Sequence, residues 1–174
     1  PLPVHRLDAQ TSGLLIIAKT KSARLDLGRQ FEQKKIKKKY RAVVVGLPPV
    51  DGFIDFPLEG KEAKTQFTLL KVEPSFKFEY LSLLELEPIT GRTHQLRIHC
   101  KEIGFPILGD SLYFLEGKEK KGKGLFLCSV SVSFIHPSSK EEISFEILQA
   151  EKFNKFMQHE KKRYTMSLNR DSSE

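Results

Sequence analysis

Asp8 is the first side chain in the sequence whose type and place could carry out chemistry. It ends the run His5-Arg6-Leu7-Asp8, and residues 9–13 separate it from the apolar run Leu14–Ala18. Functional groups often lie in loops at the edge of a strand, where a carboxylate can act as a nucleophile or stabilise positive charge. The segment also fits a structural role, in which Asp8 begins a turn and accepts hydrogen bonds from backbone amides near Gln10.

A second polar segment, Gly91-Arg92-Thr93-His94-Gln95-Leu96-Arg97-Ile98-His99, combines cations with helical spacing. We expect Thr93 to cap a helix, with Arg97 one turn later on the same face. The segment alone also fits the solvated basic face of a surface helix. His94 and His99 are not spaced with acidic partners as a metal site would require, so we predict no metal.

In the third segment, a tyrosine follows a lysine tract. Lysines at 34, 35, 37, 38 and 39 precede Tyr40-Arg41. Interleaved cations and an aromatic ring can hold phosphates and stack a base. The tract also fits a solvated loop, and Tyr40 also fits a strand residue whose ring packs into the core.

The composition favours an anionic partner. The 29 Lys and Arg residues outnumber the 22 Asp and Glu residues, which gives a net charge of +7. Such a balance favours nucleic acid, although charge alone is weak evidence. The two cysteines, Cys100 and Cys128, form neither a disulfide framework nor a zinc motif, and no apolar run is long enough to span a membrane. We therefore expect a cytoplasmic protein with no membrane association, acting as a monomer.

These segments must be positioned by a sheet with few helices. The run Leu14–Ala18 predicts a buried strand in the centre of the sheet. The lysine tract is expected to be a loop or turn. Further strands are predicted at Tyr40–Val45, Phe53–Leu58, Thr65–Val72, Phe78–Leu86, Leu125–Phe134 and Ile143–Ile147, the last two pairing with each other.

Three helices are predicted. The first is capped by Ser22 and carries Ala23, Leu27 and Phe31 on one face. The second extends from Thr93 to Gly104, where a left-handed glycine is expected to end it. The third covers residues 150–162.

Many strands without regular strand-helix alternation favour an α+β fold, with a mixed, mainly antiparallel central sheet flanked by helices. The 174 residues fit one domain. We assign it to residues 1–162 and expect residues 163–174 to form a polar, disordered tail.

Together, the polar segments resemble those of one family. The runs His5–Thr20, Gly91–His99 and Ile107-Leu108-Gly109-Asp110-Ser111-Leu112-Tyr113 are similar, in order and spacing, to those of the RluA-type pseudouridine synthases. The resemblance covers the chain to about Pro137. It implies the pseudouridine synthase fold, with an active-site cleft across the sheet. It also implies isomerisation of uridine to pseudouridine in structured RNA (rRNA or tRNA), without a cofactor.

The resemblance also implies residue roles. Asp8 corresponds to the catalytic aspartate, Tyr40 to the aromatic residue that lies against the target base, and Arg97 to the arginine that pairs with the aspartate. Arg6 would occupy the space left by a flipped uridine. RNA contacts are predicted for Arg6 and for His5, Lys38, Lys39, Arg92, Thr93, His94 and Gln95.

The chemistry suits these residue types. Cleavage of the bond between N1 and C1′ places positive charge on the sugar, which a carboxylate can stabilise or attack. Arg97 favours the ionised form of Asp8. A covalent adduct at C1′ and a glycal formed by loss of a sugar proton both remain open.

Two other functions fit parts of the pattern. The chain could be an RNA-binding module that retained the fold without catalysis. It could also be a nucleoside or glycoside hydrolase using Asp8, although no second carboxylate is evident near the motif. Members of the family normally carry a strand and a Lys-Pro-x-Gly segment ahead of His-Arg-Leu-Asp. We therefore expect the catalytic domain to be incomplete at its N-terminal side.

Overall fold

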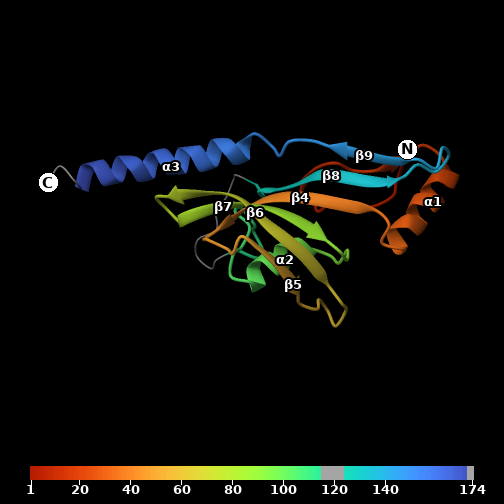
Figure 1. The fold of residues 1–174 in the computed structure, drawn as a ribbon, viewed down its shortest axis with the longest axis horizontal. Helices are drawn as coiled ribbons and strands as arrows, with labels where there is room; N and C mark the ends of the chain where they lie inside the picture. Colours follow the sequence, from red (N-terminus) through yellow and green to blue (C-terminus); the bar gives the residue numbers. More distant parts are fainter. Residues whose placement is uncertain (115–123, 172–174) are drawn as a thin grey trace.

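One large sheet organises the chain, as a computed structural model of residues 1–114 and 124–171 shows (Figure 1). Within these residues the sheet has seven strands, in the order β2-β8-β4-β7-β6-β5, with β9 also paired to β8. Only β2 and β8 pair in parallel, and the other neighbours are antiparallel. The predicted α+β class and the mainly antiparallel sheet are confirmed. The strands are β2 (Ser12–Gly13), β4 (Lys37–Val45), β5 (Asp51–Asp55), β6 (Lys64–Ser75), β7 (Glu79–Pro88), β8 (Leu127–Ile135) and β9 (Glu142–Glu146).

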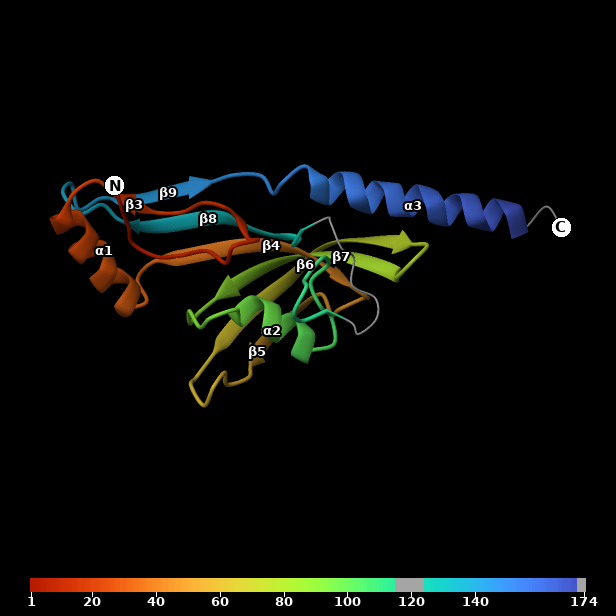
Figure 2. The same cartoon turned by 180° about the vertical axis from the view of Figure 1, so that it is seen from behind.

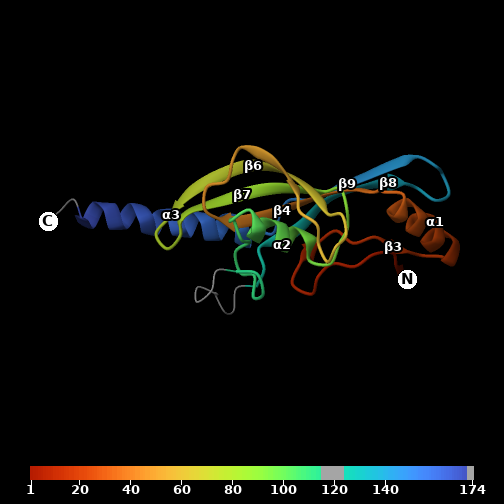
Figure 3. The ribbon, with the colours of Figure 1, turned by 90° about the horizontal axis from the view of Figure 1, so that it is seen from below.

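Three helices accompany the sheet in the described residues. Helix α1 (Lys21–Glu32) lies at one end, and α3 (Lys152–Asp171) projects past the β6–β7 hairpin at the other (Figure 1). Helix α2 (Gln95–Glu102) and the N-terminal segment lie on the same face of the sheet (Figures 2 and 3). This shared face is where the polar segments of the sequence meet.

Two hydrophobic clusters support the sheet. The larger one joins β4, β7 and β8 to α2 and α3 through residues such as Leu84, Cys100 and Phe153, all fully buried. In the smaller one, Leu27 of α1 packs with Ile16 and Val132, while Ala23 and Phe31 contact the cluster from its edge. The predicted apolar face of α1 is confirmed.

The prediction of a central strand at Leu14–Ala18 is wrong. Two short strands, β1 (Leu2–Pro3) and β3 (Ile17–Ala18), instead form a separate two-stranded sheet. Ile16 and Ala18 are buried, whereas Leu15 and Ile17 are exposed, so the run covers α1 with one side only.

Gly13 brings the N-terminal segment against the sheet. It pairs with Ser129 of β8 at a φ of 110°, and a Cβ atom here would overlap the Ser129 backbone oxygen. Only glycine combines this backbone conformation with so close an approach.

The N-terminal caps of α1 and α2 differ from prediction. Thr20, not Ser22, caps α1 by accepting a hydrogen bond from the Ala23 amide. Thr93 does not cap α2, because His94 occupies the N-cap position in a left-handed conformation with a φ of 53°. Gly104 follows α2 at a φ of 86°, as predicted.

Helix α3 does not end at residue 162 but continues to Asp171, so residues 163–171 are helical rather than a disordered tail. A polar contact holds α3 to β6 just before this continuation begins. Glu160, which is buried, accepts a hydrogen bond from Ser75 Oγ at 2.8 Å, and Arg163 Nη1 lies 3.4 Å from Glu160 Oε1. Polar contacts of this kind cannot be predicted from the spacing of apolar residues. Residues 172–174 lie outside the described part of the chain.

Strand β4 begins at Lys37, so the end of the lysine tract is strand rather than the predicted loop. Its pairing with β8 shifts between Lys39 and Tyr40, which marks a β-bulge. Because side chains alternate along a strand, Lys38 and Tyr40 share one face and Lys39 the other. The strands predicted at Leu125–Phe134 and Ile143–Ile147 correspond to β8 and β9 and pair with each other, as expected.

Candidate active site

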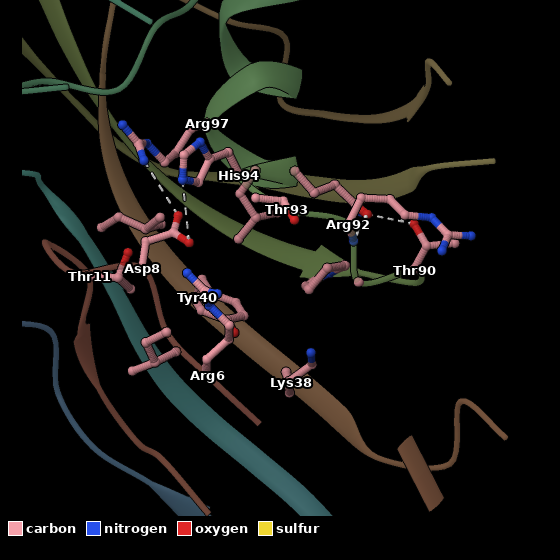
Figure 4. A pocket seen from close by; sticks show the side chains of 16 residues that line it. Arg6, Asp8, Thr11, Lys38, Tyr40, Thr90, Arg92, Thr93, His94 and Arg97 are labelled. Carbon is pink, nitrogen blue, oxygen red and sulfur yellow. Dashed lines mark hydrogen bonds and ion pairs between the residues drawn. The ribbon is translucent and has the colours of Figure 1, made fainter. Parts of the chain in front are cut away.

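The Asp8 carboxylate faces the first turn of α2 across β4 (Figure 4). Its Oδ2 lies 3.6 Å from Arg97 Nη1, and its Oδ1 lies 3.8 Å from His94 Nε2. The backbone carbonyl of Asp8 accepts a hydrogen bond from the Thr11 amide at 2.8 Å. The predicted turn therefore exists, but its hydrogen bond uses the backbone of Asp8 and leaves the carboxylate facing the cations.

Arg97 is held by a second carboxylate. Its Nε and Nη2 donate to the two carboxylate oxygens of Asp110, each at 2.7 Å, while both residues are buried. Burial alone would raise the pKa of Asp110, but hydrogen bonds from Arg97 and from the amides of Leu112 and Tyr113 hold it below its ordinary value. The bond to Asp110 likewise raises the pKa of Arg97. A bidentate pair of this kind fixes the guanidinium plane and leaves Nη1 for Asp8.

Tyr113 closes the other side of the arginine. The Arg97 guanidinium lies 5.0 Å from the centre of the Tyr113 ring, a cation–π distance. The Tyr113 hydroxyl lies 2.9 Å from His94 Nδ1. The left-handed backbone of His94 and this contact together turn its Nε2 toward Asp8.

Tyr40 enters the site from β4 and is only 8% exposed. Burial raises the pKa of its hydroxyl to about 12, hydrogen bonding to Ser129 acts in the opposite direction, and the negative charge of Asp8 raises it further. At neutral pH the side chain is therefore an uncharged phenol. It can present its ring to a base, but it is not a resident proton acceptor.

A cavity of about 190 Å³, which we call the active-site cavity, is lined by Asp8, Tyr40, His94 and Arg97 among others (Figure 4). Asp8, Tyr40 and Arg97 meet in it. Thr11 also reaches it, and its buried Oγ1 has no hydrogen-bond partner within residues 1–114 and 124–171. A substrate could satisfy that atom. Of the predicted RNA contacts, the cavity includes Arg6, Lys38, Arg92, Thr93, His94 and Gln95.

His5, Lys39 and Gln95, which were also predicted to contact RNA, instead make hydrogen bonds or ion pairs within the protein. The His5 ring accepts a hydrogen bond from the Ile16 amide at 3.0 Å and packs on Phe31. Lys39 lies 2.7 Å from Glu85 and 3.1 Å from Glu87 and does not line the cavity. Although Gln95 lines the cavity, it is only 4% exposed and joins Thr90 and the Arg92 amide to β6.

Neither Asp110 nor Tyr113 was assigned a role from the sequence, although both lie in the family-like segment Ile107–Tyr113. The sequence feature that could have pointed to Asp110 was its place in a Gly-Asp-x-x-Tyr motif. Its partner Arg97 lies 13 positions earlier on a helix, a separation that no local periodicity connects.

Among the described residues, no group of three His, Cys, Asp or Glu side chains is arranged to hold a metal ion. None of the helices within residues 1–114 and 124–171 is long and apolar enough to cross a membrane.

An α+β sheet with an aspartate, a tyrosine and an arginine in one cavity is the arrangement that the resemblance to the pseudouridine synthases led us to expect. The model of the RNA pseudouridylate synthase family matches residues 1–102. The chain therefore belongs to this family.

Within the family the chain is of the RluA type. It is 35% identical over 159 residues to the dual-specificity RNA pseudouridine synthase RluA of Escherichia coli (strain K12), which covers 82% of this chain and 71% of that protein. It is 37% identical over 172 residues to an uncharacterized RNA pseudouridine synthase of Aquifex aeolicus (strain VF5). That match covers 86% of this chain and 54% of the relative, so the chain spans about half of its length.

A solved structure has the same architecture. Human RNA pseudouridylate synthase domain containing 1 superposes with a TM-score of 0.76 at 26% identity, over 85% of this chain and 69% of that one. The predicted pseudouridine synthase fold is confirmed.

Proposed function

We propose that this chain converts uridine to pseudouridine in structured RNA, either rRNA or tRNA. Family membership supports the reaction, and one observation carries it to this chain. Asp8 lies in a cavity opposite an arginine whose orientation is already fixed by Asp110. A preoriented charge pair of this kind stabilises a charged transition state without reorganisation during the reaction.

In the proposed reaction, the N1–C1′ bond of the target uridine breaks with Asp8 beside the sugar. Asp8 either bonds to C1′ or removes a sugar proton. The uracil then turns in the cavity and C5 bonds to C1′. On the first route the bond between Asp8 and C1′ breaks in this step, and on the second route Asp8 returns the sugar proton to C2′. The proton lost from C5 is balanced by the one gained at N1. No atom is gained or lost, so the reaction is an isomerisation.

The target uridine must leave its stack to reach Asp8, at a cost of a few kcal/mol. Arg6 is exposed at the rim of the cavity and is placed to occupy the vacated space. Tyr40 contributes its ring as a surface for the uracil. Lys38 and Arg92 supply positive charge for the RNA backbone.

We also propose that the chain acts as a cytoplasmic monomer. All groups of the cavity come from one chain, and both cysteines are free and buried, as in proteins of a reducing compartment.

The test is to incubate the protein with rRNA and tRNA transcripts, digest the RNA and measure pseudouridine by mass spectrometry. Asp8→Asn is expected to form no pseudouridine while binding RNA within about threefold of the wild type, because phosphate contacts supply most affinity. Asp51→Asn, at an exposed position on β5, is the matched control and retains the activity.

Binding of RNA without any product would instead indicate a binding module that has lost catalysis. Release of free uracil would indicate a hydrolase. Loss of RNA affinity in Asp8→Asn equal to its loss of product would contradict the separation between carboxylate chemistry and phosphate binding.

A further inference from the structure

A second cavity, which we call the side cavity, adjoins the active-site cavity. It has a volume of about 470 Å³ and lies where the end of α1 and the start of β4 face residues 88–92. Ligand sites in proteins commonly span ~300–1,000 Å³, so the side cavity is large enough for a nucleotide. The residues that line both cavities are Arg6, Lys38, Pro88, Thr90, Gly91 and Arg92.

Lys38 marks the boundary between the two cavities. Within the described chain, no carboxylate oxygen lies within 4.0 Å of its Nζ, although Glu32 also lines the side cavity. Its ammonium lies 5.3 Å from the centre of the Phe31 ring, and burial lowers its pKa. Lys39, on the opposite face of the same strand, has two carboxylate partners.

A partly buried cation without a counter-ion is unfavourable, because it has lost water without gaining an opposite charge. An anion beside Lys38 would relieve that cost. Arg6 and Arg92 add positive charge on the same wall. Arg92 is held in place, because its Nε donates to the Glu62 carbonyl at 3.0 Å.

Another part of the side cavity is apolar, although His5, Glu32, Lys34 and Thr90 also line it. Phe31, Ile36 and Ile89 contribute to its walls, and Ile89 is 44% exposed. A cationic wall next to an apolar one suits a phosphate attached to a flat base, which is the chemistry of a nucleotide. Because the side cavity opens directly beside the cavity that receives the target, this nucleotide belongs to the same RNA strand.

We propose that the side cavity binds the nucleotide next to the target uridine, with Lys38 on the phosphate that links the two. The proposal rests on the proposed function and deepens it. The substrate is then an RNA segment in which two consecutive nucleotides leave the stack. Target choice depends on that local structure as well as on the uridine itself.

The experiment compares Lys38→Met with Lys39→Met, two substitutions in one lysine tract that remove the same charge. The probe is a stem-loop RNA with a single uridine in its loop, and its Kd is measured by fluorescence anisotropy. We expect Lys38→Met to raise Kd about tenfold, as for loss of a charge-assisted contact, and Lys39→Met to change it less than about twofold. Equal effects of the two substitutions would overturn the proposal.

A second arm uses the wild-type protein, so it does not depend on how a variant folds. The phosphate on either side of the uridine is replaced by an uncharged methylphosphonate, and the neighbouring base is removed in a further RNA. One of the two methylphosphonates is expected to weaken wild-type binding as much as Lys38→Met does, and to weaken Lys38→Met no further. The abasic RNA on that side is expected to bind more weakly than the intact one.

Affinities that are unchanged by all of these RNA modifications would refute the side cavity as a nucleotide site. Pseudouridine is measured separately in the same RNA. Absence of product together with a Lys38-dependent phosphate contact would reject the proposed function and retain the nucleotide site, so the two failures are distinguishable.

Discussion

Replacing Asp110 with asparagine tests how the active-site arginine is held. Asp110 is 2% exposed, accepts two hydrogen bonds from Arg97 and two from the amides of Leu112 and Tyr113. Asparagine has nearly the same shape but no charge. The change therefore leaves the Arg97 guanidinium, itself 5% exposed, without its buried counter-ion.

The expected loss of stability is large. Breaking a buried ion pair by removing one partner costs about 3–5 kcal/mol, and Asp8 at 3.6 Å replaces little of this because it is a more exposed and more distant partner. For a chain of this size each kcal/mol lowers Tm by roughly 2–4 °C, so Asp110→Asn is expected to lower Tm by about 6–20 °C. The freed guanidinium also shifts relative to Asp8, and pseudouridine formation falls with it.

Differential scanning calorimetry at pH 7 measures the effect. Asp8→Asn is the control, and it is expected to cost less than about 1 kcal/mol because Asp8 is partly exposed. A double variant, Arg97→Met with Asp110→Leu, removes both charges and is expected to regain most of the lost Tm without regaining activity. A Tm of Asp110→Asn within about 2 °C of the wild type would refute the assignment of this pair as the support of the site.

Three further outcomes are expected. Tyr40→Phe keeps the ring and is expected to preserve the Kd for RNA, because the ring is the surface for the uracil; weaker binding would contradict the stacking role. The pKa of His5 is lowered to about 4, mainly by burial, so the folded state binds fewer protons than the unfolded state between that value and 6.5. Stability should therefore fall as the pH drops from about 6.5 toward 4, and Tm should depend less on pH in His5→Asn but not in the control His159→Asn. Gly13→Ala is expected to cost about 1–3 kcal/mol in urea unfolding, because of its positive φ and the overlap with Ser129; a neutral result would show that β2 can move away from β8.

The sequence predicted the parts of the site that lie in recognisable motifs. The resemblance assigned roles to Asp8, Tyr40 and Arg97, and these three residues meet in one cavity. The ion pair with Asp110 could not be predicted in the same way. A bidentate contact depends on where the loop after α2 returns in space, and this is set by tertiary packing rather than by spacing.

The errors in the fold have a similar origin. The run Leu14–Ala18 has the composition of a central strand, but composition does not say whether a second layer covers its other side. The lysines from position 37 onward look like a loop, yet pairing with β8 overrides their low strand propensity. The extension of α3 past residue 162 was missed because its described side chains are exposed or half-buried, so no apolar face marks it in the sequence.

The two faces of strand β4 have different roles, although their residues alternate along the chain. Lys38 and Tyr40 face the cavities, whereas Lys39 and Arg41 face the glutamates of the opposite surface. Substitutions on the outward face can replace one surface ion pair with another at little cost in stability. Substitutions at the inward positions change groups that face the cavities and therefore the RNA. Among related chains, the residue type should therefore vary more at every second position of this strand. Relatives that prefer a different RNA target should differ at position 38 more often than at position 39.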